Sequence, residues 1–155
     1  MTHMAHDARV QADLSALGRY SASSSHDPSW GPDRASLSLV CIREGGQAWH
    51  AAAHDANQWL MVSWCGTPVT VSSFATKGRT DYDQWTTQYL FEYTLDGITW
   101  INPFGPGEPR AGNTDRNSVV RHVLPEPVRA RAVRVRPTAW HGHIAMRLAV
   151  YGSFD

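Results

Sequence analysis

Residues 87–101 read TQYLFEYTLDGITWI, and this stretch predicts the class of fold. Its first part, residues 87–94, is rich in aromatic and β-branched side chains, which favour strands. Leu95-Asp96-Gly97 is a turn signature, and β-forming residues return at 98–101. We therefore expect two strands of a hairpin in this stretch.

Further short strands are separated by turn signals along the chain. Residues 130–136 (ARAVRVR) alternate Arg with Ala or Val, which predicts a strand with one packed face and one solvated face. Residues 102–113 contain three Gly and three Pro and are expected to form a loop. A helical period is weak and confined to residues 8–17. The remaining predicted strands are 36–42, 59–64, 69–74 and 144–151.

This pattern predicts an all-β fold. About seven or eight short strands with irregular loops are typical of a β-sandwich or jelly roll. The residues Cys65-Gly66-Thr67-Pro68 separate two of the predicted strands, and we expect them to form a hairpin connection.

The composition is that of one globular domain. The chain has 155 residues, is 42% hydrophobic and carries no formal net charge. It contains no apolar run long enough for a membrane span. Residues 1–13 show no signal peptide, so we expect a cytoplasmic protein or one released to the cell surface or extracellular space by a non-classical route. In that setting Cys41 and Cys65 are expected to be reduced, buried thiols.

The order and spacing of several motifs resemble the discoidin, or coagulation factor type C, domain family. The motifs in the first half are Ser21-Ala22-Ser23-Ser24, Trp30-Gly31-Pro32, Ala48-Trp49-His50-Ala51 and Asn57-Gln58-Trp59-Leu60. Those in the second half are Lys77-Gly78-Arg79, Asp83-Gln84-Trp85, Asp96-Gly97-Ile98-Thr99-Trp100, residues 112–117, residues 127–131, residues 136–140 and Arg147-Leu148. Within the family, the N-terminal domain of the slime-mould discoidin lectins is the most similar.

The resemblance implies an eight-stranded antiparallel jelly-roll β-sandwich of the galactose-binding-domain type. It implies a domain over residues 20–155, with residues 1–19 as an N-terminal extension that packs on it. It also implies a lectin that binds galactose or N-acetylgalactosamine on glycans through loops at one end of the sandwich, and that is no enzyme. Phospholipid or protein binding, as in an adhesion module, is the alternative that the family offers.

Two departures from the family concern cofactors and cross-links. The cysteine pair that joins the two chain ends in the family is missing. Acids that hold calcium in many galactose-binding relatives are replaced by Ala149 and by the segment Arg43-Glu44-Gly45-Gly46. We therefore expect no cofactor and do not expect a calcium site.

A galactose site needs an exposed aromatic ring for the C–H face of the sugar, with polar groups aimed at its hydroxyls. We assign Asp33 as a hydroxyl acceptor and Arg79 as a bidentate donor. Gln47 or Glu44 would supply a further contact, and Trp49 or Trp85 the stacking face. The candidate carbohydrate-binding residues are Asp33, Glu44, Gln47, Trp49, Arg79, Asp83 and Trp85.

Each candidate has a structural alternative. Trp49 and Trp85 stand at the starts of strands: Trp49 fits the core as well as the site, and for Trp85 the core is the favoured interpretation, because a strand begins directly after it. Arg79 is able to pair with Asp81 or Asp83 and so order its own loop. Residues 113–117 (NTDRN) are expected to form a polar turn whose side chains cap their own backbone.

Other function classes find less support. His50 and His54 are four apart, and His141 and His143 are two apart, but no acid or Cys completes either pair, so no metal site is predicted. No hydrolase motif is present. The C-terminal Arg residues lie in a strand pattern without interleaved aromatics, so nucleic-acid binding is not expected. Weak monovalent sugar binding favours a homo-oligomer or a larger assembly.

Overall fold

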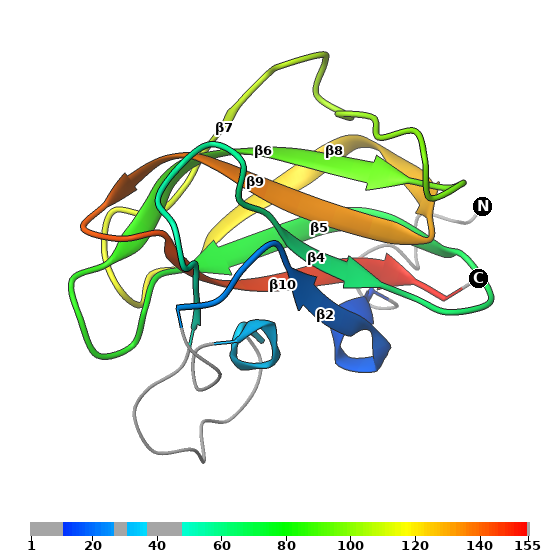
Figure 1. The fold of residues 1–155 in the computed structure, drawn as a ribbon. Helices are drawn as coiled ribbons and strands as arrows, with labels where there is room; N and C mark the ends of the chain where they lie inside the picture. Colours follow the sequence, from blue (N-terminus) through cyan, green and yellow to red (C-terminus); the bar gives the residue numbers. More distant parts are fainter. Residues whose placement is uncertain (1–10, 27–30, 37–47, 155) are drawn as a thin grey trace.

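Two antiparallel sheets lie face to face and enclose the core (Figure 1). This computed structural model describes residues 11–26, 31–36 and 48–154. The first sheet has the strand order β1-β10-β5-β8, with β3 also paired to β10, and the second has the order β2-β4-β9-β6-β7. The fold is therefore the all-β sandwich that the sequence predicts.

The elements follow one another from β1 to β10 with two short 3₁₀ turns, η2 and η4, between the early strands. Their bounds are β1 Ala12–Asp13, η2 Leu14–Leu17, β2 Arg19–Ala22, η4 Pro32–Arg34, β3 Trp49–His50, β4 Leu60–Ser63, β5 Val69–Lys77, β6 Trp85–Thr94, β7 Arg110–Ala111, β8 Val120–Ala130, β9 Ala132–His141 and β10 Ala145–Ser153.

The core lies between the sheets and is built from their inward-facing side chains. Phe74 of β5 and Phe91 of β6 belong to different sheets, and their rings stack with centroids 4.0 Å apart and planes within 2° of each other. Both rings are fully buried. The hydroxyl of Tyr20 donates to the carbonyl oxygen of Leu148 at 2.6 Å and so links the second sheet to the first. Burial raises the pKa of Tyr20 to about 12, so its hydroxyl stays protonated as a donor.

Most predicted strands are confirmed, and the alternation in residues 130–136 is visible as buried Val133 and Val135 beside half-buried arginines. The predicted hairpin at residues 95–97 is reduced to one bridge, between Tyr93 and Ile101. The predicted loop at 102–113 contains the two-residue strand β7. Most of the predicted strand 36–42 lies outside the described residues.

Two expectations, the hairpin at residues 65–68 and the burial of Cys65, were wrong, and two further features of the fold were not predicted. Residues 65–68 do not form a hairpin, because β4 and β5 lie in different sheets. Strand β8 was not predicted, since it contains two prolines, and it lies at a sheet edge, where proline is tolerated. The weak helical period yields a single 3₁₀ turn at η2. Cys65 is a free but exposed thiol, not a buried one; Cys41 lies outside the described residues.

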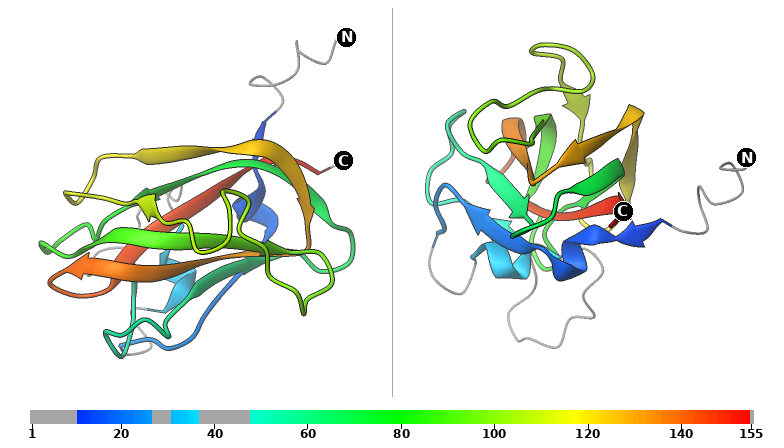
Figure 2. Two further views of the ribbon diagram at one scale, coloured as in Figure 1. Left: turned by 90° about the horizontal axis from the view of Figure 1, so that it is seen from above. Right: turned by 90° about the vertical axis from the view of Figure 1, so that its right-hand side faces the viewer.

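The connections between strands divide into two ends (Figures 1 and 2). The β5–β6 and β9–β10 connections lie at one end, on the left of Figure 1 and of the left view in Figure 2. The β4–β5 and β8–β9 connections lie at the other. We call the first the loop end; it is formed by residues 78–84 and 142–144.

The Phe74–Phe91 stack is expected to be a main source of sheet-to-sheet cohesion. Phe91→Ala should lower the free energy of unfolding by about 3–5 kcal/mol, because it leaves a cavity between the sheets. Urea denaturation monitored by tryptophan fluorescence measures this change. Ile98→Ala is the control, since Ile98 is 83% exposed, and it should change stability by less than about 0.5 kcal/mol. Equal effects of the two substitutions would contradict this view of the core.

Candidate functional site

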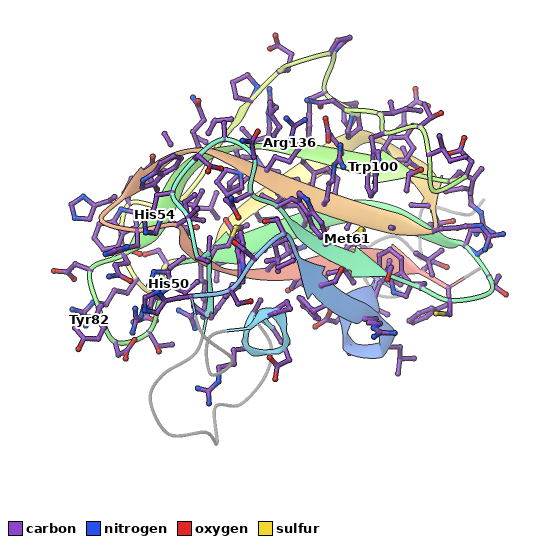
Figure 3. The ribbon with its side chains drawn as sticks, viewed as in Figure 1. His50, His54, Met61, Tyr82, Trp100 and Arg136 are labelled. Atoms are coloured by element: carbon purple, nitrogen blue, oxygen red, sulfur yellow. The ribbon has the colours of Figure 1, made fainter. Side chains whose placement is uncertain are left out.

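The loop end carries a dense group of polar and aromatic side chains. Figure 3 shows His50, His54 and Tyr82 there, whereas Trp100 and Arg136 lie away from it on the second sheet. His50 belongs to β3, His54 to the segment that follows it, and Tyr82 to the β5–β6 connection. Segments far apart in the sequence therefore meet at this end.

Arg147 of β10 joins the β5–β6 connection to the β7–β8 connection. Its side chain is 6% exposed. Its Nε donates to the carbonyl oxygen of Gly78 at 2.7 Å, and its Nη2 donates to the carbonyl oxygen of Arg116 and to Oδ1 of Asn117, both at 2.8 Å. The segments also touch directly, since a Cβ at Gly78 would lie 2.7 Å from the carbonyl oxygen of Asp115. A buried arginine thus sets the spacing of the loops.

Residues 113–118 form the self-bonded polar turn that the sequence predicts. Oδ1 of Asp115 accepts from the backbone N–H of Ser118 at 2.8 Å, and its Oδ2 accepts from the Ser118 hydroxyl at 2.6 Å. These bonds hold the pKa of Asp115 below its usual value. Asn113 donates to the carbonyl oxygens of Thr76 and Ser118. This confirms the structural role expected for the segment.

Arg79 orders the β5–β6 connection. It is 6% exposed. Its Nε donates to Oδ1 of Asp81 at 2.8 Å, its Nη1 donates to Oε1 of Gln84 at 2.7 Å, and the same Nη1 lies 3.5 Å from Nδ1 of His50. The predicted pairing with Asp81 is therefore confirmed. Asp83 pairs instead with Arg116, at 2.9 Å.

Tyr82 is the aromatic side chain of the site that the sequence reasoning missed. Its ring is 56% exposed, and Cζ of Arg79 lies 4.5 Å from the ring centroid. The guanidinium covers one face of the ring, in a cation–π contact, and leaves the ring open to solvent elsewhere. Its position between two aspartates, Asp81 and Asp83, is the sequence signal for an aromatic residue that a polar loop keeps at the surface.

The two candidate tryptophans have different positions. Trp49 is fully buried, and its indole N–H donates to the carbonyl oxygen of Ser24 at 2.7 Å, so it is a core residue and not a stacking face. Trp85 is half-buried, and its ring stacks on that of His141 with centroids 4.6 Å apart. It stays available to a ligand.

The other predicted residues are only partly brought together. Asp83 and Trp85 line one hollow of about 480 Å³, which Asp115 and Arg116 also border. Asp33 is exposed on η4, which packs against β2 and β3. Glu44 and Gln47 lie outside the described residues.

Four histidines gather beside Arg79. The ring of His50 lies 4.7 Å from that of His26, 5.0 Å from that of His143 and 5.9 Å from that of His54, centroid to centroid. Nε2 of His54 and Nδ1 of His143 are 2.6 Å apart. The sequence suggests the pairs 50/54 and 141/143; in the structure His143 joins the first pair, and His141 lies instead against Trp85.

His50 is the histidine most affected by these surroundings. Burial, followed by the nearby His26 and Arg79, lowers its pKa from 6.5 to about 4. Burial and His143 also lower the pKa of His54. Nε2 of His50 is buried and has no hydrogen-bond partner in the described part of the chain. The cluster is therefore neutral near pH 7 at these two positions, with one buried nitrogen that makes no bond.

The lowered pKa of His50 predicts a dependence of stability on pH. Between pH 6.5 and pH 4 the unfolded chain takes up a proton at His50 that the folded chain does not, so stability is full above this window and falls as the pH decreases through it. The loss from this group should be at most about 3 kcal/mol. Urea denaturation at several pH values between 7 and 4 measures it.

The control for this dependence is His50→Gln, which removes the titrating group and keeps a polar side chain. Its stability should fall less steeply over the same window. A contribution from His54 remains, because its pKa is lowered too. The hydrogen-bonded aspartates Asp55, Asp96 and Asp115 titrate below their usual pKa of 3.8 and act at lower pH. Parallel curves for the two proteins would contradict the assignment to His50.

Ala149 stands in the last strand at the position where the family resemblance implies an acidic calcium ligand. Ala149 is fully buried in β10 and pairs with Ala75 of β5, and its methyl group offers no oxygen ligand to a hard cation such as Ca²⁺. The segment 43–46, the other departure from the family pattern, lies outside the described residues.

Comparisons with known proteins agree on one family. The model of the F5/8 type C domain matches residues 19–150. A discoidin-1 chain of Dictyostelium discoideum is 40% identical over 108 residues, which are 70% of this chain and 42% of that protein. The structure of recombinant discoidin II of the same organism matches with a TM-score of 0.82 and 28% identity, over 91% of this chain and 58% of the other. The chain thus spans about half the length of these relatives.

A third similarity concerns the fold alone. The family 32 carbohydrate-binding module of Clostridium perfringens NanJ, solved in complex with galactose, matches with a TM-score of 0.70 and 19% identity, over 92% of this chain and 100% of that one. The galactose-binding-like jelly roll is therefore confirmed. Among the described residues, no helix has the length and apolar character needed to cross a membrane.

Proposed function

Because this chain belongs to the F5/8 type C, or discoidin, domain family, we propose that it is a carbohydrate-binding module and not an enzyme, and that it binds glycans carrying galactose or N-acetylgalactosamine at the loop end. The sugar is bound over the β5–β6 connection. Tyr82 supplies the stacking face, and the polar groups beside it contact the hydroxyls. No cofactor takes part in this contact.

The exposed ring of Tyr82 is the observation that carries the proposal. A galactose ring has one face of C–H groups, which packs on an aromatic ring. Tyr82 is held by the buried Arg79 on one side and is 56% exposed. Such a ring is a pre-ordered platform, because the loop beneath it is already fixed by Asp81 and Gln84.

Polar groups of the β5–β6 connection lie next to Tyr82 in the sequence. Asp81 and Asp83 are exposed carboxylates on either side of Tyr82 in the sequence and accept hydrogen bonds from sugar hydroxyls. The hollow beside Asp83 and Trp85 gives room for a second sugar unit.

Two findings on relatives support this proposal. The slime-mould discoidins share the family and the fold, and a module with the same fold was solved with galactose bound. A shallow site of this kind should bind a monosaccharide with a dissociation constant of about 0.1–1 mM. Useful capture of a glycan then requires several sites, so we also propose that the chain acts as a homo-oligomer or within a larger assembly.

Tyr82→Ala is the direct test of the platform. It should weaken galactose binding about five- to twelvefold, the loss expected when an aromatic contact of about 1–1.5 kcal/mol is removed. Its melting temperature should stay within about 2 °C, because an exposed side chain contributes little to stability. Isothermal titration with galactose and with N-acetylgalactosamine measures the first effect, and calorimetry the second.

Phe154→Ala is the matched control, since Phe154 is an aromatic residue of similar exposure, 43%, that lines a hollow with Trp64 and Cys65. That hollow is at the opposite end, by the β4–β5 connection. This variant should bind galactose like the unmodified chain. Unchanged binding by Tyr82→Ala would exclude the platform.

The alternative is an adhesion module that binds phospholipid or protein. Membrane insertion needs exposed apolar side chains at the tips, and at the loop end the large exposed apolar residues among those described are Tyr82 and Val119. The protein should therefore remain in solution when phosphatidylserine vesicles are sedimented. If it sediments with vesicles and galactose does not titrate, the lectin proposal is wrong and the alternative takes its place.

A further inference from the structure

Three of the clustered histidines have the arrangement of a metal site. They are His50 in β3, His54 in the β3–β4 connection and His143 in the β9–β10 connection. One ring nitrogen from each lies within 4.8 Å of the other two. His26 stacks on His50 but lies outside this group of ligand atoms.

The spacing is close to what one ion requires. Zn²⁺–N bonds of about 2.0–2.1 Å place two ligand nitrogens of a tetrahedral site about 3.3 Å apart. The His54–His143 nitrogens, at 2.6 Å, must therefore open slightly, and the widest separation of 4.8 Å must close. His54 is exposed and His143 is half-buried, so rotation of their side chains supplies these shifts. His50 is buried in β3, so the other two side chains move toward it.

A second observation points independently to a ligand. Nε2 of His50 is buried without a hydrogen-bond partner in the described chain, and a buried polar atom without a partner is costly. Arg79 is purely a donor, so the proton of neutral His50 belongs on Nε2, where it has no acceptor among the described residues. An ion bound at Nε2 would satisfy this atom; the proton would then move to Nδ1, and the long 3.5 Å contact between Nδ1 and Nη1 of Arg79 would be given up.

We propose that His50, His54 and His143 bind one divalent transition-metal ion of the Zn²⁺ class, with a fourth position open to water or to another donor. Three imidazoles and no carboxylate favour Zn²⁺ or Co²⁺ over Ca²⁺ or Mg²⁺, which prefer oxygen ligands. Neutral imidazole is the form that binds metal.

Proton positions follow from the present contacts. The backbone N–H of Ile144 donates to Nδ1 of His54 at 3.2 Å, so His54 holds its proton on Nε2 and donates it to Nδ1 of His143. A metal ion would take the place of the proton between Nε2 of His54 and Nδ1 of His143. That proton would move to Nδ1 of His54, the hydrogen bond from the Ile144 N–H would be lost, and no proton would be released from the protein. His143 needs no change, since its Nδ1 is already an acceptor.

This site goes beyond the proposed sugar binding and does not depend on it. The metal is titrated alone, without any sugar, so that failure of one proposal is distinct from failure of the other. His3 and His6 lie outside the described residues, and both are replaced by Ala in every protein of the series. Metal bound to the N-terminal segment is thereby excluded from the measurement.

The test is a titration of the EDTA-treated and desalted protein with ZnCl₂ by calorimetry and with CoCl₂ by visible absorption. One equivalent of Zn²⁺ should bind with a dissociation constant of about 10 μM or tighter. Co²⁺ should give the intense visible bands of a tetrahedral site. His54→Ala and His143→Ala should each weaken Zn²⁺ binding at least about tenfold.

His141→Ala is the matched control, because His141 is two residues from His143 but stacks on Trp85 and is not in the group. It should bind Zn²⁺ within about twofold of the parent. His54 is exposed, so His54→Ala should fold, as a thermal scan in EDTA will show. The proposal is overturned if Zn²⁺ binds at less than half an equivalent, or if folded His54→Ala and His143→Ala bind it as tightly as the parent.

Discussion

The buried guanidinium of Arg147 links the sandwich to its loop end. It stands in β10, a strand that pairs with β1, β3 and β5, and donates to carbonyl oxygens on both sides of the site, at Gly78 and Arg116. A buried cation is stable only when its donors are satisfied. The carbonyl oxygens of Gly78 and Arg116 therefore have to lie where Arg147 reaches them, which fixes the two loops relative to each other at these points.

A second buried arginine, Arg79, orders the loop that presents Tyr82 at the surface. Arg79 uses its donors on Asp81 and Gln84, which closes the β5–β6 connection into a fixed loop. Tyr82 at the tip of that loop is exposed yet held in place by the guanidinium beneath it. Pre-ordering of this kind matters for a weak ligand, because an ordered loop loses less entropy on binding. The positive charge also disfavours protonation of the adjacent His50.

Much of the fold was predictable from local patterns. Alternation in residues 130–136 predicts β9, and the aromatic run at 87–94 predicts β6, because side chains in a strand face alternate sides. Strand β8 was not predictable, since its two prolines suggest a loop until the sheet edge is known. For the candidate site, Arg79 was proposed from the motif at 77–79, and Asp83 and Trp85 from the motif at 83–85 of the same predicted loop. Trp49 was compatible with the site and with the core, and only its burial assigns it to the core.

By itself the sequence determined the all-β class, the family and the loop that carries Arg79, Asp83 and Trp85. The class and the loop depend on patterns within a few residues, and the family on the order and spacing of motifs along the chain. Only the tertiary structure decided that His143 joins His50 and His54, that Arg116 pairs with Asp83, and that Tyr82 lies over Arg79. The first two are contacts between residues distant in the sequence. Their formation depends on the pairing of β3 with β10 and of β6 with β9, and on where Arg147 places the loops. The contact between Tyr82 and Arg79 joins residues close in the sequence, but the burial of Arg79 depends on the tertiary structure.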